Sequence, residues 1–583
     1  MLGFIFMVAA IVNFYYFRTY GNKIDIFIFG LKDDDTLAIF EILWRDYPLI
    51  LGIISAIAYG IFTLFLYNIS HQFFSIFTTL QPFLPHFRLR AKSAITLISQ
   101  FLCIILLIIG ARGSLGTYPL KEDNYRISTL PIFNHLATNP LLALDWAYSN
   151  YKADAHISPP SAQRGEALQE ALFPLLRQSP YSMFLKDNPP HIVVNLMESF
   201  GSNMLIYDEL PHNDLLGALR KHFDEDFVFF RFLSGANGTL ASFFMLFFDS
   251  PTPLSRGSAK TTSLPYNPFA IYANAGYEVI YITSGYESWQ NTGDYMRIQG
   301  VGHIYDALHL MERFPQSKKD KNAYGIPDEY AYKLAFEILS NAQKPTFIAI
   351  LTTSNHPPYH LPHTYAPKPI TLSEAIKAKA KNNEAKQKLQ TSMTLYQYAN
   401  NAFGEFLDRI KDSALKSKTI IAATGDHYVR DFSSNPSTDK AIAYAVPFYI
   451  YVPQDYAKAI HYDSTRIGSH KDIFPTLYEL SLSHTQYMSV GGRNILATQD
   501  KAPYAFGYNQ AAWIDKKGIY PINEAVGYMW GDSQKGFGLL SSDTQIALSP
   551  QKKAFGSSLN ELFAYAIAWR IFNPNPQEQP SSH

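Results

Sequence analysis

The sequence predicts an α/β protein in which N-terminal transmembrane helices precede a domain built on a mainly parallel sheet. Three observations predict this fold class. Long apolar runs occupy the first part of the chain, continuous apolar strand-like runs alternate with helical stretches in the second part, and ligand-type polar residues directly follow several of those runs. A chain of 583 residues is also too long for one ordinary domain.

Three uncharged apolar runs open the chain, at Met1–Phe17, Leu49–Tyr67 and Ser93–Ala111. A membrane-spanning helix needs roughly 20 apolar residues, and each run comes close to that length. The first run can also be read as a signal peptide, but it lacks a basic start and a small-residue cleavage site, and further apolar runs follow it. We therefore predict transmembrane helices in residues 1–112.

The charges between these runs predict their orientation. The link between the second and third runs carries Arg88, Arg90 and Lys92 and no acidic residue, whereas the link between the first and second runs is rich in Asp and Glu. The positive-inside rule places the basic link in the cytoplasm. We expect a multi-pass protein in which everything after Arg112 lies outside the cytoplasm.

Composition excludes several classes of function. Lys plus Arg and Asp plus Glu both number 49, so the net charge indicates no nucleic-acid partner. The single cysteine, Cys103, lies inside the third apolar run, which excludes a disulfide framework and a cysteine-based zinc site. Aromatic residues make up 15% of the chain, which suits a membrane interface or a carbohydrate or lipid site without being specific to either.

The remaining chain divides into three parts. Residues 113–185 are predicted to form a linker with helices along the membrane surface, residues 186–499 the catalytic domain, and residues 500–583 its C-terminal extension. Apolar runs predict strands at His191–Met197, Phe227–Leu233, Glu278–Thr283, Thr346–Leu351, Lys418–Ala423 and Val446–Val452, and helices at Glu329–Leu339, Thr391–Asp412 and Lys471–Leu480. Continuous apolar strands separated by helices predict a sheet covered on both faces. The polar segment Thr371–Gln387 is expected to be a solvated helix or loop.

Ligand-type residues follow three of these strands, namely Glu198, His356, and the pair Asp426 and His427. Because the carboxyl ends of parallel strands meet at one edge of a sheet, we expect these side chains to converge there. Carboxylate and imidazole groups suit Mn²⁺ or Mg²⁺, and Zn²⁺ is not excluded. Taken alone, Glu198 can equally be a charge at a helix N-terminus.

Thr239 lies in the sequence Gly-Ala-Asn-Gly-Thr-Leu-Ala-Ser, where glycines let backbone N–H groups approach an anion. A metal that lowers the pKa of such a hydroxyl makes it a nucleophile. The alternative is an ordinary helix N-cap at Thr239 or Ser242.

Two further motifs place histidines near the same edge. His356 lies in a loop stiffened by two prolines, where it can donate to a phosphate oxygen, bind a second metal, or simply be exposed. His470 precedes a helix that Asp472 can cap. His360 and His470 are the candidates for a second metal or phosphate contact.

The ordered set Met-Glu-Ser-Phe, Gly-Thr, Ser-Asn-His-Pro-Pro-Tyr, Gly-Asp-His and Ser-His-x-Asp-x-x-Pro-Thr-Leu resembles the lipoteichoic acid synthase and phosphoglycerol transferase family. That family lies within the alkaline phosphatase and sulfatase superfamily, so the resemblance implies an alkaline-phosphatase-like α/β/α domain. The stretch Arg112–Leu120 also resembles the family's segment after its last membrane helix. The resemblance runs from about residue 49 to residue 494.

The resemblance implies a role for each motif. Glu198, Thr239, Asp426 and His427 would hold one Mn²⁺ or Mg²⁺. Thr239 would attack the phosphorus of a lipid donor, and His356 would contact the phosphate or assist the leaving alcohol. Trp289 and Arg297 resemble the region that binds the phosphoglycerol headgroup, although their spacing differs from the family's tight Trp-x-Arg and leaves the headgroup open.

The implied activity is transfer of phosphoglycerol from phosphatidylglycerol to a glycan, polymer or lipid acceptor at the bacterial inner (cell) membrane. The domain would face the periplasm or the cell exterior. A phosphoethanolamine transferase acting on lipid A or another surface acceptor is the alternative. A sulfatase or a phosphatase is less favoured, since no Cys/Ser-x-Pro/Ala-x-Arg stretch for a formylglycine is present. A catalytically inactive anchoring protein is disfavoured because Thr239 and Asp426 are both retained.

Overall fold

The computed structural model describes residues 2–20, 23–29, 43–44, 47–79, scattered positions between 101 and 121, and 127–574 apart from 155–156, 358, 379, 381, 431, 433–438, 532–537 and 540. The chain forms two compact units. The first comprises residues 1–154, 256–258 and 288–290, and the second comprises the remaining residues.

The first unit is helical. Its described helices are α1 (Leu2–Tyr20), the 3₁₀ turn η1 (Ile26–Phe29), α4 (Leu49–Thr79), α6 (Pro131–Ala137) and α7 (Pro140–Ala153). Helix α1 contacts α4 and α7, and Tyr16 donates a hydrogen bond to Asp25 at 2.5 Å.

Among the described residues, one helix is long and apolar enough to cross a membrane, with Leu49–Ile69 of α4 as the candidate span. The apolar part of α1, Gly3–Arg18, is shorter. The third predicted span, 93–111, lies largely outside the described residues. A multi-pass topology therefore stays a prediction.

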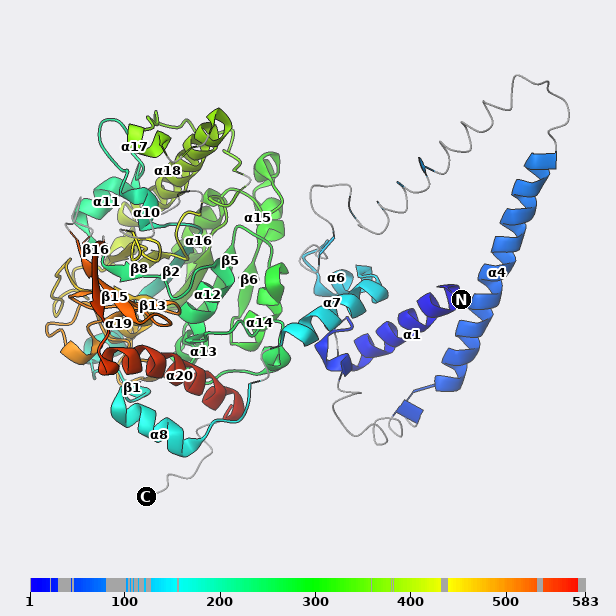
Figure 1. Ribbon diagram of the computed structural model, residues 1–583, viewed down its shortest axis with the longest axis horizontal. Coiled ribbons are helices and arrows are strands. Elements are labelled where there is room, and N and C mark those ends of the chain that lie inside the picture. The colour runs from blue at the N-terminus through cyan, green and yellow to red at the C-terminus, as the bar shows by residue number, and fades with distance from the viewer. Residues whose placement is uncertain are drawn as a thin grey trace. The chain divides into compact units, whose positions relative to one another are not determined.

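The second unit is built on a seven-stranded sheet with the order β3-β9-β8-β2-β7-β5-β6 (Figure 1). The strands are β2 (His191–Met197), β3 (Phe227–Phe229), β5 (Glu278–Thr283), β6 (His303–Tyr305), β7 (Thr346–Leu351), β8 (Thr419–Gly425) and β9 (Phe448–Tyr451). The five strands from β8 to β6 run parallel, and β9 and β3 form an antiparallel edge. The predicted mainly parallel sheet is confirmed.

Helices cover both faces of this sheet because alternate residues of each buried strand point to opposite sides. Ile348 and Ile350 of β7 pack into one core with α16 (Glu329–Asn341) and α18 (Asn383–Lys411). Phe347, one residue before Ile348, contacts Phe269 of α13 (Pro268–Asn274) and Phe474 of α19 (Ile473–Ser481) on the other face. Every residue of β2, β7 and β8 is buried, which explains their mostly apolar sequence.

The structure differs from the predicted elements at three places. The run Phe227–Leu233 is broken, and its last two residues form β4 (Phe232–Leu233), which pairs in parallel with β10 (Gly468–Ser469) outside the main sheet. Helix α18 begins eight residues earlier than predicted, at Asn383, because Asn382 caps it by accepting a hydrogen bond from the Ala385 N–H.

The third difference concerns residues 157–185, which were assigned to the linker but pack within the second unit. Helix α8 (Ala162–Ala171) contacts α20 (Pro550–Phe572), and β1 (Leu176–Gln178) pairs with β11 (Gln486–Met488). The C-terminal part adds a five-stranded antiparallel sheet in chain order, made of β12 (Gly507–Asn509), β13 (Ala512–Ile514), β14 (Gly518–Pro521), β15 (Val526–Trp530) and β16 (Ser541–Ala547).

The close approach at the end of β8 generates a stability prediction. A Cβ added to Gly425 would lie 2.2 Å from the Phe200 carbonyl oxygen, so Gly425→Ala forces backbone to move. We expect a loss of about 1–3 kcal/mol, the usual cost of overpacking, and a melting temperature lower by several degrees in thermal unfolding of the full chain.

Gly302→Ala is the matched control, because its added Cβ would lie at an ordinary 3.4 Å from the Val279 carbonyl oxygen. Equal melting temperatures for the two variants would contradict the prediction.

Candidate active site

The ends of β2 and β8 bring three ligand-type side chains together. Met197 pairs with Gly425 in the parallel register, so the next residues, Glu198 and Asp426, leave the sheet side by side. One ligand atom from each of Glu198, Asp426 and His427 lies within 4.8 Å of the others, and all three residues are buried. The predicted convergence at the carboxyl edge therefore occurs for these three residues.

Thr239 is the first residue of α12 (Thr239–Phe248) and reaches this cluster. Its Oγ1 donates to Glu198 Oε2 at 3.1 Å and lies 3.4 Å from His427 Nε2. The interpretation of Thr239 or Ser242 as an N-cap is wrong, since α12 has no side-chain cap. Ser242 Oγ instead lies within hydrogen-bonding distance of the Asp426 and Ala236 carbonyl oxygens, at 2.5 and 2.9 Å, and so joins α12 to the end of β8.

Hydrogen bonds orient the donor atoms toward one point. His427 Nδ1 lies 2.7 Å from the Tyr428 carbonyl oxygen, which assigns the proton to Nδ1 and leaves the Nε2 lone pair facing the cluster. Asp426 Oδ1 accepts from the backbone N–H groups of Ser199 and His427, both at 2.7 Å. Asp426 Oδ2 is buried and accepts no hydrogen bond from the described residues, although His427 Nε2 is 3.4 Å away.

The electrostatics of the cluster favour a bound cation. Burial raises the pKa of Asp426 to about 7, and the neighbouring Glu198 carboxylate adds to the effect. Burial lowers the pKa of His427, but the Asp426 and Glu198 carboxylates outweigh it and the net shift is upward. The Asp426 Oδ2 without a hydrogen-bond donor and the unprotonated His427 Nε2, with a second carboxylate and a hydroxyl, fit Mn²⁺, Mg²⁺ or Zn²⁺.

His470 does not face this centre with a free nitrogen, contrary to the prediction. Its Nδ1 accepts from the Gly235 N–H at 3.1 Å and its Nε2 lies 3.0 Å from the Gly425 carbonyl oxygen, to which it donates. Burial lowers the pKa of His470 to about 4, so the ring is neutral at pH 7. His470 thereby ties the loop before Thr239 to the end of β8, which is a structural role.

The remaining predicted histidines lie in the loop after β7. The loop is joined to the cluster because Glu198 N–H donates to Thr352 Oγ1 at 3.0 Å. The His356 ring packs on Tyr324 with centroids 3.9 Å apart. His360 Nε2 lies 3.6 Å from Asp320 Oδ1 and belongs to no described metal-ligand group.

The two residues assigned to the headgroup come before and within α14 (Thr292–Ile298). Arg297 makes a bidentate contact with Glu287, at 2.8 and 2.7 Å, and a third contact with Asp294 at 3.1 Å. Two carboxylates therefore match its charge in this structure. Trp289 lies in the 3₁₀ turn η4 (Trp289–Asn291), and its contact with a headgroup stays a prediction.

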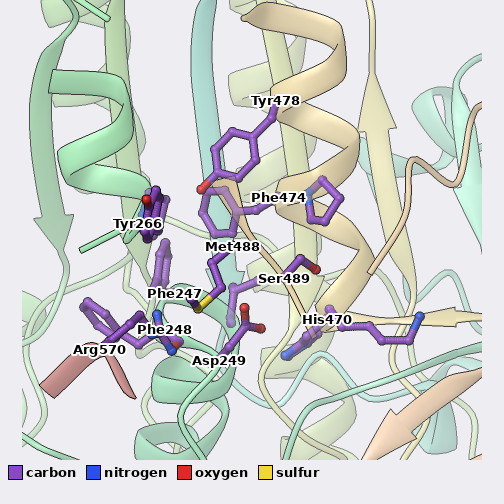
Figure 2. A pocket seen from close by; sticks show the side chains of 14 residues that line it. Phe247, Phe248, Asp249, Tyr266, His470, Phe474, Tyr478, Met488, Ser489 and Arg570 are labelled. Atoms are coloured by element: carbon purple, nitrogen blue, oxygen red, sulfur yellow. The ribbon is translucent and has the colours of Figure 1, made fainter. Parts of the chain in front are cut away.

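Sequence reasoning missed a buried polar pocket at the far end of α12 (Figure 2). Asp249 ends the helix in a left-handed conformation with φ 47°, and burial raises its pKa to about 7. Arg570 of α20 lies beside it and donates to the Phe248 carbonyl oxygen. An arginine at a helix C-terminus satisfies a free carbonyl and opposes the negative end of the dipole. The C-terminal helix thus holds the helix that begins with Thr239.

A family model described as sulfatase matches residues 190–482, about half of the chain. The chain belongs to the sulfatase family. A curated relative in this group, the lipoteichoic acid synthase of Staphylococcus saprophyticus subsp. saprophyticus, is 21% identical over 278 residues, which cover 44% of this chain and 40% of the relative. The match therefore spans less than half of that relative's length, and it agrees with the resemblance found in the motifs.

Two solved structures resemble this chain in fold. A protein of the alkaline phosphatase superfamily from Vibrio parahaemolyticus is 19% identical with a TM-score of 0.54, covering 70% of this chain and 97% of its own. The lipoteichoic acid synthase LtaP from Listeria monocytogenes is 16% identical with a TM-score of 0.51, covering 71% and 98%. At these identities the likeness shows the fold, which is the predicted alkaline-phosphatase-like α/β architecture.

The cluster of Glu198, Asp426 and His427 predicts that the protein binds a metal ion. Asp426→Asn keeps the shape of the side chain but removes the charge of the orphaned oxygen, so Mn²⁺ should raise the melting temperature of the full chain much less than in the wild type. Asp294→Asn, which removes a carboxylate outside the cluster, is the control and should respond to Mn²⁺ like the wild type. An equal Mn²⁺ response in Asp426→Asn would exclude Asp426 as a ligand.

The raised pKa of Asp426 generates a prediction about pH. Below about pH 7 the metal-free carboxyl holds a proton that a cation must displace, so Mn²⁺ affinity should fall as the pH falls through 7. One displaced proton weakens apparent affinity about tenfold per pH unit. Calorimetric titrations at about pH 8, 7 and 6 measure the slope. A constant affinity across this range would show that Asp426 binds the ion without losing a proton.

Proposed function

We propose that this sulfatase-family protein transfers the phospho-headgroup of a phospholipid to an envelope glycan, polymer or lipid acceptor, with phosphatidylglycerol as donor and Thr239 as nucleophile. The observation that carries the proposal is the hydrogen bond from Thr239 Oγ1 to Glu198 inside the buried cluster of two carboxylates and one imidazole. A hydroxyl can form an ester with phosphorus, and the Thr239 hydroxyl is within 3.4 Å of both Glu198 and His427.

The residues divide the reaction into two displacements. A divalent cation held by Glu198, Asp426 and His427 would lower the pKa of the Thr239 hydroxyl and neutralise charge on the phosphate. Glu198 Oε2 takes the hydroxyl proton as Thr239 Oγ1 bonds to phosphorus, and the bond from phosphorus to the diacylglycerol oxygen breaks. The diacylglycerol oxygen takes up a proton from solvent as it leaves. An acceptor hydroxyl then attacks the same phosphorus and gives its proton to solvent, and Thr239 Oγ1 recovers the proton held by Glu198 as its bond to phosphorus breaks.

The chain's apolar N-terminal helices support a lipid donor. A substrate that resides in a bilayer suits an enzyme with a candidate membrane span at Leu49–Ile69. The names of the relatives point the same way, because the Staphylococcus saprophyticus relative and the Listeria monocytogenes structure are both lipoteichoic acid synthases. We therefore place the protein in the bacterial inner membrane, with the catalytic unit on its outer side.

Phosphoethanolamine transfer is the second candidate. The observation that favours it is the pairing of Arg297 with Glu287 and Asp294. A guanidinium matched by two carboxylates adds little positive charge to attract phosphoglycerol, and the surrounding carboxylates are compatible with an amine headgroup. The nucleophile and the metal cluster would be the same in either reaction.

The nucleophile is tested with the full chain in detergent, Mn²⁺, and fluorescent phosphatidylglycerol and phosphatidylethanolamine in parallel. We expect diacylglycerol release from phosphatidylglycerol, loss of at least about 10³-fold in Thr239→Ala, and partial activity in Thr239→Ser, because serine keeps the hydroxyl. Thr371→Ala, which removes an exposed threonine, is the control and should match the wild type.

Each outcome of this assay has a distinct meaning. Release from phosphatidylethanolamine alone would keep the mechanism and change the donor. Activity that survives in Thr239→Ala would refute the proposed nucleophile. A phosphorylated wild-type peptide containing Thr239, trapped by acid quenching and absent from Thr239→Ala, would identify the covalent intermediate directly.

A further inference from the structure

Arg430 lies beside Gly238, the residue before the proposed nucleophile, and makes no ion pair or hydrogen bond with the described residues. It follows His427 by three positions, on the segment that leaves the end of β8. Its Nη2 lies 3.4 Å from the point that a Cβ on Gly238 would occupy, and Gly238 is the residue directly before Thr239. The side chain is exposed, so its guanidinium can be reached from solvent.

The position of Arg430 brings its positive charge close to Gly238, the residue that precedes Thr239. Arg297 is different, because Glu287 and Asp294 hold its guanidinium.

The proposed reaction favours a further cation near the phosphate, besides the metal. A phosphodiester carries one negative charge on two non-bridging oxygens, and attack by an alkoxide adds a second charge in the transition state. A guanidinium near the metal would add to the neutralisation of that charge. An arginine presents N–H groups in a planar fork that matches two oxygens of one phosphate, which a lysine ammonium cannot do.

We propose that Arg430 is a catalytic residue that binds the non-bridging phosphate oxygens while Thr239 is attacking or is esterified. The proposal rests on the proposed function and deepens it by naming the group that holds the substrate's phosphate. Arg430 neither gains nor loses a proton in the reaction. It strengthens its hydrogen bonds as charge develops on the oxygens, and it therefore acts on the rate as well as on binding.

The first arm of the test measures turnover. The full chain with Mn²⁺ is assayed for diacylglycerol release from whichever fluorescent lipid the wild type uses, and kcat and KM are separated. Arg430→Gln should lower kcat/KM roughly 10- to 100-fold, the usual cost of losing a charge-assisted pair of hydrogen bonds. Arg430→Lys should recover only a minor part of that loss, because lysine restores the charge but not the planar pair of N–H donors.

The second arm measures binding without turnover, with inorganic phosphate as the probe. Phosphate should stabilise the Mn²⁺-loaded wild type against thermal unfolding, and its apparent affinity should fall about tenfold or more in Arg430→Gln. The Mn²⁺ affinity and the melting temperature of the metal-loaded variant should stay at wild-type values, which separates a role at the phosphate from a purely structural one. Arg313→Gln, at the end of α15 (Ala307–Arg313), is the exposed-arginine control and should change neither quantity.

The two arms separate this proposal from the proposed function. If the wild type releases diacylglycerol from neither lipid, the donor assignment fails, while a phosphate affinity that still depends on Arg430 supports the present inference. Arg430→Gln that keeps kcat/KM within twofold of the wild type, or that binds phosphate equally well, would overturn it. A kcat/KM for Arg430→Lys equal to that of the wild type would also overturn the proposal, because a positive charge without the planar guanidinium would then be enough for activity.

Discussion

The parallel register between β2 and β8 is the constraint on which the site depends. Two carboxylates and an imidazole share a buried space because Glu198 and Asp426 each leave the sheet one residue after a paired position. Two hydrogen bonds help to hold this register at its end. The Asp426 N–H donates to the Met197 carbonyl oxygen at 3.0 Å, and the Ser199 N–H donates to the side-chain Oδ1 of Asp426 at 2.7 Å. A slip of one residue would turn one of the two carboxylates to the opposite face of the sheet and disperse the cluster.

Much of the sheet and the core of the site were predictable from the sequence. Strands β2, β5 and β7 coincide with their predicted ranges because they are buried on both faces and read as continuous apolar runs. Glu198, Asp426 and His427 were predictable because parallel topology alone brings the residues after such strands together. Thr239 was identified through its glycine-rich setting and the ordered motifs.

The errors arose where a side chain's partner lies far away in the sequence. His470 has the appearance of a ligand, but its two nitrogens are used by Gly235 and Gly425, which only the folded chain brings to it. Arg297 looks like an anion-binding residue until Glu287 is seen beside it. Arg430 was missed for the opposite reason. Nothing in its local sequence distinguishes it, and only the folded chain brings it close to Gly238. The strands β12 to β14 are three or four residues long and carry too little periodicity to be recognised.

The C-terminal part of the chain supports α12, the helix that begins with the proposed nucleophile Thr239, at both of its ends. At the N-terminal end, Asn509 of β12 donates to the Ser234 carbonyl oxygen at 2.9 Å and to Asn237 Oδ1 at 3.1 Å, and so braces the loop that precedes Thr239. At the other end, Arg570 donates to the last carbonyl of α12. The region that matches the sulfatase family ends at residue 482. A fragment cut at that boundary would retain Glu198, Thr239, Asp426 and His427 yet lose the contacts that hold α12 at both ends. The segment that matches the family is therefore smaller than the unit that positions Thr239.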